Sequence, residues 1–326
     1  MEFLMTKPLL DIHRLTTCFS SAQGIAKAVD NVSLSFMQGE TLAIVGESGC
    51  GKTVLALSIL GLIPDPPGRV TDGSILYRDK DLLDMSESEL MHIRGNAISM
   101  IFQEPMTALN PVFRIDDQIA EPLRLHQGFG KREALEKAVD ALNLVGIPNP
   151  AKIARSFPHE LSGGMRQRVM IAMALACNPD ILIADEPTTA LDVTIQAQIL
   201  DLMDELRERM NGSLMLITHD LGVVARMALR VAVMYSGKIV ELAGVNDLYA
   251  EPLHPYTQGL LASMPSLGET RPLSPIPGIV PSIFDLPQGC RFHPRCPKAY
   301  QKCSLMLPPL FEPEPGRTVR CWLYED

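Results

Sequence analysis

One stretch of the sequence has the residue types and the spacing of a phosphate-binding loop. It consists of Gly46, Glu47, Ser48, Gly49, Cys50, Gly51, Lys52 and Thr53. This order fits the pattern GxxxxGK followed by Ser or Thr, whose glycines let successive backbone N–H groups point at an anion. Lys52 would reach the β- and γ-phosphates of a nucleotide, and the Thr53 hydroxyl would ligate Mg²⁺. A plain glycine-rich turn between a strand and a helix is the alternative.

Two carboxylates at the end of a strand-like run have the positions that nucleotide hydrolysis requires. Asp185 and Glu186 follow the apolar residues 181–184. Asp185 would help to hold Mg²⁺, and Glu186 would polarise the attacking water, because this chemistry depends on positioning and charge stabilisation. His219, after another apolar run, would contact the γ-phosphate. Without the phosphate loop, the carboxylates would simply cap the next helix and His219 would be a structural histidine.

The elements that must position these residues alternate between strand and helix types. Apolar runs typical of strands occur at 9–12, 32–36, 41–45, 98–102, 181–184 and 214–218. Helical patterns occur at 54–60, 131–145 and 166–177, and Ser162 is the expected N-cap of the last helix. This alternation predicts an α/β fold with a mainly parallel sheet. The early strands predict a β-rich entry subdomain.

Composition and charge exclude several classes of protein. The 326 residues carry a net charge of −9, with 46% hydrophobic and 21% charged residues. An acidic chain without a basic cluster argues against nucleic acid as a partner. No apolar run approaches the roughly 20 residues that span a bilayer, and residues 1–10 lack the pattern of a signal peptide. We therefore expect a cytosolic protein whose membrane role comes through partner subunits.

The C-terminal part of the chain, 253–326, differs in composition and reads as a separate appendage. Fourteen of the 26 prolines lie between Pro252 and Pro315, which leaves little room for regular secondary structure. Four of the seven cysteines also lie there: Cys290, Cys296, Cys303 and Cys321. Their spacing, C-x5-C-x6-C-x17-C, matches neither ordinary zinc modules nor the ferredoxin run, although four thiolates can hold either zinc or an iron–sulfur cluster. Free or disulfide-bonded thiols are the remaining alternative.

The order of the motifs resembles that of the ATP-binding cassette (ABC) ATPases. Over residues 9–250 the motifs are the phosphate loop, Gln103 after a strand, Leu161-Ser162-Gly163-Gly164, Ile181 to Glu186, Thr189-Ala190-Leu191-Asp192 and His219. The resemblance implies a P-loop NTPase nucleotide-binding domain over 1–252, with a RecA-like core and a helical subdomain at about 104–178. It implies ATP and Mg²⁺ as ligands, and Gln103 would couple Mg²⁺ and water to a segment that touches a membrane subunit. By position, Phe19 resembles the aromatic residue that stacks on adenine, although a core role is the simpler alternative.

The same resemblance implies that part of this chain serves another subunit. Ser162, Gly163 and Gly164 would complete the nucleotide site of a facing ATPase, where the N-terminus of their helix meets the γ-phosphate. Asp192 is also expected to belong to a nucleotide site. Two residues depart from the family pattern, since Met165 replaces a glutamine and Thr189 replaces a serine. Neither change removes a phosphate ligand, so both half-sites of this chain are expected to be competent.

The C-terminal part resembles the extension of dipeptide and oligopeptide permease ATPase subunits. The shared motifs are 104–111, His254-Pro255-Tyr256-Thr257, Pro277-Gly278, Gly289-Cys290 and Pro294-Arg295-Cys296-Pro297. The resemblance implies an ATPase that drives a di- or oligopeptide importer from the cytoplasmic face of the inner membrane, as a peripheral protein. Its implied partners are a second homologous ATPase, expected as a heterodimer, two transmembrane permease subunits and, indirectly, an extracytoplasmic solute-binding protein. Importers of nickel, opines or other small solutes are the alternative.

The resemblance also assigns the cysteines of the extension. In the related permease ATPases this pattern is associated with a 4Fe-4S cluster, so Cys290, Cys296, Cys303 and Cys321 are expected to hold one, with Zn²⁺ as the alternative. A bound metal centre would supply folding energy to a proline-rich segment. Cys50 is different because it lies inside the phosphate loop, where alkylation or oxidation is expected to block nucleotide.

Two other kinds of ABC protein are disfavoured by the sequence. ABC ATPases of DNA repair carry long insertions between the phosphate loop and the Leu161–Gly164 motif, and those of translation carry two cassettes in one chain. This sequence has one cassette and no such insertion. A non-catalytic regulatory subunit would lack Glu186 or His219, and both are present.

Overall fold

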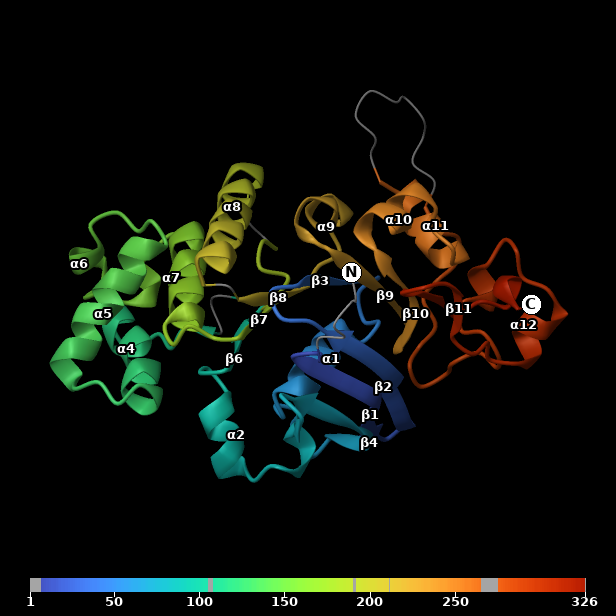
Figure 1. The fold of residues 1–326 in the computed structure, drawn as a ribbon, viewed down its shortest axis with the longest axis horizontal. Helices are drawn as coiled ribbons and strands as arrows, with labels where there is room; N and C mark the ends of the chain where they lie inside the picture. The colour runs from blue at the N-terminus through green and yellow to red at the C-terminus, as the bar shows by residue number, and fades with distance from the viewer. Residues whose placement is uncertain (1–6, 105–107, 190–191, 211, 265–274, 326) are drawn as a thin grey trace, which may run out of the picture. The chain divides into compact units, whose positions relative to one another are not determined.

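The computed structural model describes residues 7–104, 108–189, 192–210, 212–264 and 275–325 (Figure 1). The chain divides into two compact units. The first comprises Met1–Met37, Thr41–Asp84 and Ile217–Asp326, and the second comprises Gln38–Glu40 and Met85–Leu216. The phosphate loop therefore belongs to the first unit, whereas Asp185 and Glu186 belong to the second.

An antiparallel sheet in the first unit corresponds to the expected β-rich entry. Its strands, in spatial order, are β2 (Gly24–Phe36), β1 (Leu10–Ser21), β4 (Gly68–Tyr77) and β5 (Lys80–Asp81). β1 and β2 are much longer than the apolar runs that predicted them. The register between them shifts after Ile12, Leu15 and Thr17. Such irregularities break the alternation of apolar and polar residues, which is why the sequence pattern showed only the ends of these strands.

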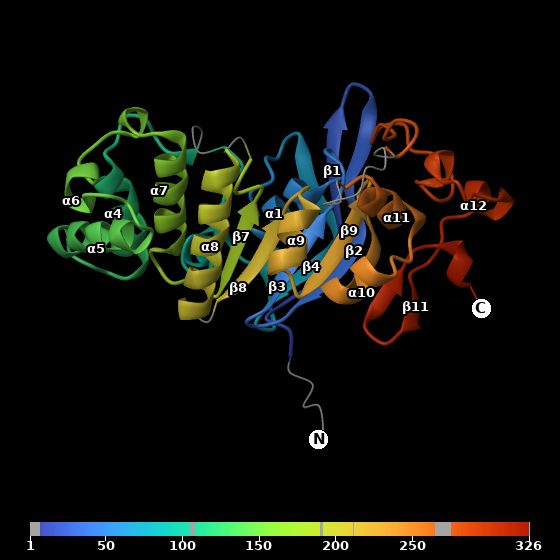
Figure 2. The same ribbon diagram turned by 90° about the horizontal axis from the view of Figure 1, so that it is seen from above.

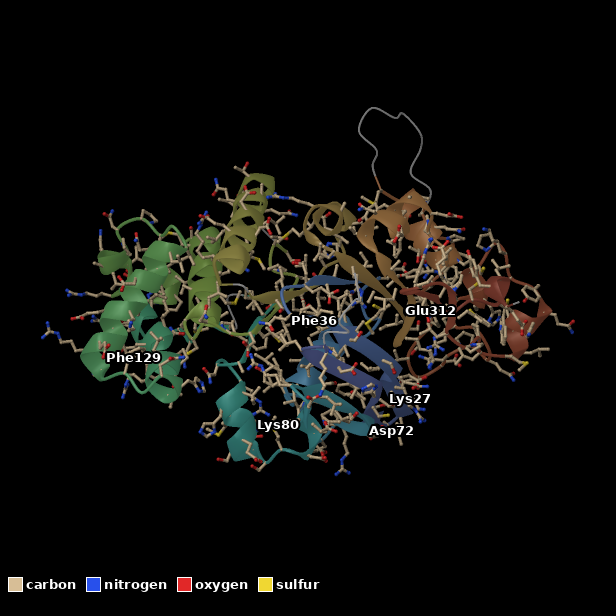
Figure 3. The ribbon with its side chains drawn as sticks, in the orientation of Figure 1. Lys27, Phe36, Asp72, Lys80, Phe129 and Glu312 are labelled. Atoms are coloured by element: carbon tan, nitrogen blue, oxygen red, sulfur yellow. The ribbon has the colours of Figure 1, made fainter. Side chains whose placement is uncertain are left out.

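The antiparallel sheet has a buried side and a solvated side. Phe36 at the end of β2 is fully buried. Lys27 on β2, Asp72 on β4 and Lys80 on β5 are exposed (Figure 3). This division is typical of an antiparallel sheet that packs on a core with one face only.

A second sheet of the first unit leads into the phosphate loop. Its strands, in spatial order, are β3 (Thr41–Val45), β9 (Arg230–Tyr235), β10 (Lys238–Gly244), β12 (Arg317–Val319) and β11 (Phe311–Glu314). β3 pairs with β9 in parallel, as expected, whereas β9 and β10 are antiparallel. Every residue of β3 is buried, and the chain passes from β3 through the loop into α1 (Lys52–Ile59).

The C-terminal residues belong to the first unit, and the division of the chain at residue 252 stays a prediction. β12 pairs with β10 and extends that sheet. Phe292 lies in one buried cluster with Tyr235 of β9 and Tyr256. The remaining helices of this unit are α9 (Leu221–Met227), α10 (Val245–Ala250), α11 (Pro255–Ala262) and α12 (Gln301–Leu305), which Figure 2 shows from above. Burial against the sheet therefore orders a proline-rich segment that has little secondary structure of its own.

In its described residues, the second unit contains three strands and a group of helices. The strands, in spatial order, are β8 (Ser213–Ile217), β7 (Ile181–Asp185) and β6 (Ile98–Ile101). β6 and β7 are parallel, again as expected. The helices are α2 (Glu87–Ile93), α4 (Ile115–His126), α5 (Lys131–Leu144), α6 (Pro150–Ile153), α7 (Gly163–Leu175) and α8 (Val193–Met210).

Several helices of the second unit form one packed group, within the range in which the sequence predicts a helical subdomain. α4, α5 and α7 pack against one another, as the green part of Figure 1 shows. Their contact surface contains Ile119, Leu123, Ala138 and Leu142, all of which are buried. These residues recur at intervals of four along α4 and α5, so each helix presents one apolar stripe to the others. α7 carries the Ser162–Gly164 motif at its N-terminal end.

Candidate active site

The phosphate loop has a backbone that only glycine allows at two of its positions. Gly46 has a φ of +152° and Gly51 a φ of +107°. A Cβ atom on Gly46 would fall on the carbonyl oxygen of Met234, and one on Gly51 would fall on that of Ala28. Both glycines are therefore required by close approach to neighbouring strands as well as by their left-handed backbone.

Lys52 is held inside the loop that it belongs to. Its side chain is 6% exposed, and Nζ donates hydrogen bonds to the carbonyl oxygens of Gly46 at 2.8 Å and Glu47 at 3.2 Å. Thr53, the next residue, is exposed at the start of α1. No side chain caps the N-terminus of α1, and its first turn has no acidic residue. This end of the helix can therefore donate backbone N–H groups to an anion.

Cys50 is poorly placed for the chemistry expected of it. The side chain is 1% exposed, and burial raises the pKa of its thiol. Because the thiolate is the reactive form, a buried and protonated thiol reacts slowly with alkylating agents. The surroundings of Cys50 thus disfavour its modification, and the effect of a modified Cys50 on nucleotide binding stays a prediction.

In the second unit, Glu186 is held by two of the residues that the sequence singled out. Gln103 Nε2 donates a hydrogen bond to Glu186 Oε2 at 3.1 Å, and Thr189 Oγ1 donates to the same oxygen at 2.9 Å. Glu186 also has a φ of +47°, a left-handed backbone that is uncommon for a residue with a side chain. Asp185, directly before it, is buried at the end of β7.

Thr189 shows why a departure from the family pattern is tolerated. The hydroxyl of threonine makes the bond to Glu186 that a serine hydroxyl at the same position would also make. The neighbouring residues Ala190 and Leu191, which the sequence placed in the same motif, lie outside the described residues.

The Ser162–Gly164 motif and Asp192 line one cavity of about 570 Å³ in the second unit. Ser162 is the N-cap of α7, as predicted, and its hydroxyl accepts a hydrogen bond from the backbone N–H of Met165 at 3.4 Å. Ser162 and Gly163 are exposed to solvent. Asp192 Oδ1 accepts a hydrogen bond from the backbone N–H of Ile195 at 2.9 Å and so caps the start of α8.

Gln167 connects the helix of the Ser162–Gly164 motif to the segment after Glu186, and sequence reasoning missed this connection. It is buried on α7, and its Nε2 donates a hydrogen bond to the backbone oxygen of Pro187 at 2.6 Å. The helix that begins at Ser162 is thereby tied to the residue directly after Glu186. Because Arg166 and Arg168 flank Gln167, the local pattern contained no signal of its burial.

His219 and Phe19 lie in the first unit. His219 is exposed, and Asp220 beside it caps α9 by accepting hydrogen bonds from two backbone N–H groups. Phe19 is partly buried near the end of β1, with its ring close to Gly68 of β4. Their contacts with nucleotide stay predictions.

Two residues of the C-terminal extension contact the phosphate loop, which no sequence pattern predicted. The Glu47 side chain forms an ion pair with Arg295, and the Glu47 backbone N–H donates to the hydroxyl of Tyr256. Both residues stand in the motifs that carried the resemblance of the extension. Their separation from Glu47 along the chain hides the contact from any local pattern.

The four cysteines of the extension gather around one small cavity. They are Cys290, Cys296, Cys303 and Cys321, and all are free thiols. Burial, together with the other three thiols, raises the pKa of Cys321 to about 11. Among the residues that the structure describes, no three His, Cys, Asp or Glu side chains are arranged to hold a metal ion. The expected metal-binding character of the extension is therefore not confirmed.

None of the helices within the described ranges is both long enough and apolar enough to cross a bilayer.

Comparison with known proteins places both parts of the chain. A family model described as "ABC transporter" matches residues 29–189, and one described as "Oligopeptide/dipeptide transporter, C-terminal region" matches residues 240–303. The oligopeptide transport ATP-binding protein AppD of Bacillus subtilis is 55% identical over 98% of this chain and 97% of its own length. The dipeptide transport ATP-binding protein DppD of the same organism is 50% identical over 97% and 95%.

A solved structure supports the fold of the cassette. It is the dimeric structure of a post-hydrolysis state of the ATP-binding cassette MJ0796, bound to ADP and Pi. It matches with a TM-score of 0.65 and 28% identity, and covers 72% of this chain and 98% of its own. Two-thirds or more of the chain is thus matched both by close relatives and by a cassette with bound nucleotide.

Proposed function

The chain belongs to the ATP-binding subunits of oligopeptide and dipeptide ABC transporters, and we propose that it hydrolyses ATP to drive peptide import through membrane permease subunits. The observation that carries the catalytic part is the arrangement of Glu186, whose carboxylate is held by Gln103 and Thr189. A fixed carboxylate orients water better than a freely rotating one, because it does not have to be ordered during the reaction.

The phosphate loop provides the binding half of the reaction. The N–H groups of the loop and of the start of α1 receive the phosphates, and Lys52 exchanges its carbonyl partners for phosphate oxygens. Thr53 offers a hydroxyl oxygen, Asp185 a carboxylate and Gln103 an amide oxygen, which are the hard oxygen ligands that Mg²⁺ prefers. Bound Mg²⁺ neutralises charge on the phosphates. Glu186 then accepts a hydrogen bond from the attacking water and aligns it.

The cavity beside Ser162 supports pairing with a second ATPase. Ser162 and Gly163 are exposed there at the N-terminus of a 13-residue helix, where anions are favoured. We propose that this cavity receives the γ-phosphate of nucleotide bound to a facing, homologous ATPase subunit. The similar cassette MJ0796 is dimeric with bound ADP and Pi, which is consistent with this arrangement.

Peptides are the favoured cargo. The relatives with the highest identities quoted above are an oligopeptide and a dipeptide transport protein, and the model for the C-terminal region carries the same description. Nickel, opines or other small solutes are the second candidate. With either cargo, the protein would work as a peripheral subunit at the cytoplasmic face of the membrane, held there by its permease partners.

The cargo is tested by coupling. The full chain is co-purified with its permease subunits and its second ATPase, reconstituted into vesicles, and assayed for ATP hydrolysis with solute-binding protein on the opposite side. Peptide-loaded binding protein is expected to raise the hydrolysis rate severalfold, and binding protein without peptide, or with Ni²⁺, is expected to leave it unchanged. Stimulation by Ni²⁺ alone would transfer the assignment to the second candidate.

For the cysteines of the extension we propose a 4Fe-4S cluster. The support is that four free thiols from distant positions line one cavity. Four thiolates are the ligand set of such a cluster, and they can equally hold a zinc ion, which is the alternative. The cluster would stabilise the extension when bound.

A further inference from the structure

The C-terminal extension contacts the phosphate loop through Arg295. Its Nη1 donates a hydrogen bond to Glu47 Oε2 at 2.7 Å, and its Nη2 donates to Oε1 at 3.0 Å. This bidentate geometry is the strongest form of an arginine–carboxylate pair. The Arg295 side chain is 4% exposed and that of Glu47 28%. The hydrogen bond with Glu47 raises the pKa of Arg295 above its ordinary value, so the guanidinium is always charged.

Arg295 is itself fixed by its surroundings in the extension. Its Nε donates to the backbone oxygen of Pro277 at 2.9 Å, and Nη1 also lies 3.4 Å from the Tyr235 hydroxyl. The guanidinium carbon lies 5.8 Å from the ring centre of Tyr235 and 5.9 Å from that of Phe292. These contacts leave one orientation for the side chain, so little rotamer freedom is lost when it binds Glu47.

Tyr256 holds the same loop residue from another side. Its hydroxyl accepts a hydrogen bond from the Glu47 backbone N–H at 2.8 Å. The ring is fully buried, with centroids 4.7 Å from Tyr235 and 5.3 Å from Phe292. Glu47 is therefore held at both its backbone and its side chain by residues that share one aromatic cluster.

The contact has an electrostatic consequence for an anionic ligand. Glu47 places a carboxylate within a loop whose other features all favour phosphate, and an unpaired carboxylate at that place would repel a nucleotide. The ion pair with Arg295 neutralises this charge. The ion pair also fixes the position of the Glu47 side chain. The backbone carbonyl oxygens of Gly46 and Glu47 are the ones that accept hydrogen bonds from Lys52.

We propose that Arg295 is a positioning residue for nucleotide binding, which neutralises Glu47 and holds the phosphate loop in its binding conformation. The inference rests on the proposed role of the loop and extends it, because it makes the affinity for ATP depend on the C-terminal extension. Arg295 ends the short turn His293–Arg295 and directly precedes Cys296. The position of Arg295, and with it the conformation of the phosphate loop, therefore depends on how well the cysteine-bearing segment is ordered.

The proposal is tested by equilibrium binding of a fluorescent ATP analogue to the purified full chain. Arg295→Met keeps the length and apolar contacts of the side chain and is expected to weaken binding about tenfold, as the loss of a charge-assisted pair implies. Adding Glu47→Gln to this variant removes the unpaired carboxylate and is expected to restore most of the affinity. A purely structural role of Arg295 predicts instead that the loss and the recovery of affinity follow the melting temperatures of the two variants, which are measured alongside.

Two further variants separate the possible outcomes. Arg317→Met removes another buried arginine of the extension, 7% exposed, which pairs with Glu314 and does not touch the loop, and its affinity for the analogue is expected to be unchanged. Lys52→Ala tests the loop itself, and normal binding in that variant would overturn the proposed site independently of Arg295.

Normal binding in Arg295→Met would contradict the role of Arg295, as would a double variant that binds no better than Arg295→Met alone. If Arg295→Met does not fold, Arg295→Gln decides the point, since it keeps a hydrogen-bond donor but removes the charge that neutralises Glu47. Weaker binding that Glu47→Gln relieves supports the proposal, and unchanged binding rejects it.

Discussion

At the scale of single residues, ATP hydrolysis depends on how the Glu186 carboxylate is held. Gln103 and Thr189 both donate to the same oxygen, and the backbone of Glu186 adopts a left-handed conformation. Strain of this kind persists only when neighbouring contacts fix the residue, and it is common where a side chain must be aimed. The Thr189 hydroxyl is therefore one of the contacts that fix the carboxylate, a role that a serine hydroxyl can also fill.

The hydroxyl of Thr189 is predicted to matter for turnover and its methyl group to matter little. Thr189→Val removes the hydrogen bond to Glu186 at nearly constant volume and is expected to lower the rate of ATP hydrolysis about tenfold, the equivalent of one such bond to a charged group. Thr189→Ser keeps the donor and is the matched control, with a rate close to that of the unaltered protein. Equal rates for the valine and serine variants would show that this bond does not position the carboxylate.

At the scale of elements, the strand–loop–helix unit around the phosphate loop is set by backbone contacts with its neighbours. Gly46 and Gly51 approach the carbonyl oxygens of Met234 and Ala28 so closely that no side chain fits. The start of helix α7 is stabilised differently, because the Ser162 side chain caps its first turn. The start of α1 is thus fixed by closely packed glycines, and the start of α7 by an N-cap.

Gly46→Ala is predicted to disrupt the phosphate loop, because the added methyl group meets backbone rather than a flexible side chain. We expect the protein to lose nucleotide binding and to melt at a lower temperature. Gly130→Ala is the control, because Gly130 has an ordinary extended backbone and open space around its Cα. Thermal unfolding with and without ATP measures both effects, and a Gly46→Ala protein that ATP still stabilises would contradict the prediction.

Much of this arrangement was predictable because it is local. The phosphate loop, the N-cap at Ser162 and the helix at 131–145 are encoded by residues within a few positions of one another. The full lengths of β1 and β2 were not predictable, because shifts of register interrupt their apolar alternation. The contact between Glu47 and Arg295 joins residues 248 positions apart, and no periodicity or spacing records such a pair.

At the scale of the whole molecule, the extension acts as part of the first unit. β12 pairs with β10, and Phe292 packs against Tyr235 and Tyr256 in a cluster that Cys290 and Cys296 also contact. This burial explains how a proline-rich segment is ordered. It also means that a change in the cysteine-bearing part alters the cluster that holds the phosphate loop.

A 4Fe-4S cluster in the extension predicts both colour and iron. Anaerobically purified protein is expected to be brown, with broad absorbance near ~400 nm and about four irons per chain. Cys303→Ser removes one thiol and is expected to lower the iron content and the melting temperature, because a bound centre contributes to folding. Cys18→Ser, outside the extension, is the control and should keep its iron. Colourless protein that contains only zinc would reject the cluster.

The central claim, that this chain is an ATPase, is tested most directly by Glu186→Gln. The substitution keeps the shape of the side chain but removes the charge that aligns water, so the account predicts normal ATP affinity and loss of nearly all hydrolysis. Glu133→Gln, an exposed glutamate in the first turn of α5, is the matched control and should hydrolyse ATP normally. Phosphate release is measured at saturating ATP and Mg²⁺. Hydrolysis by Glu186→Gln at the rate of the unaltered protein would contradict the account.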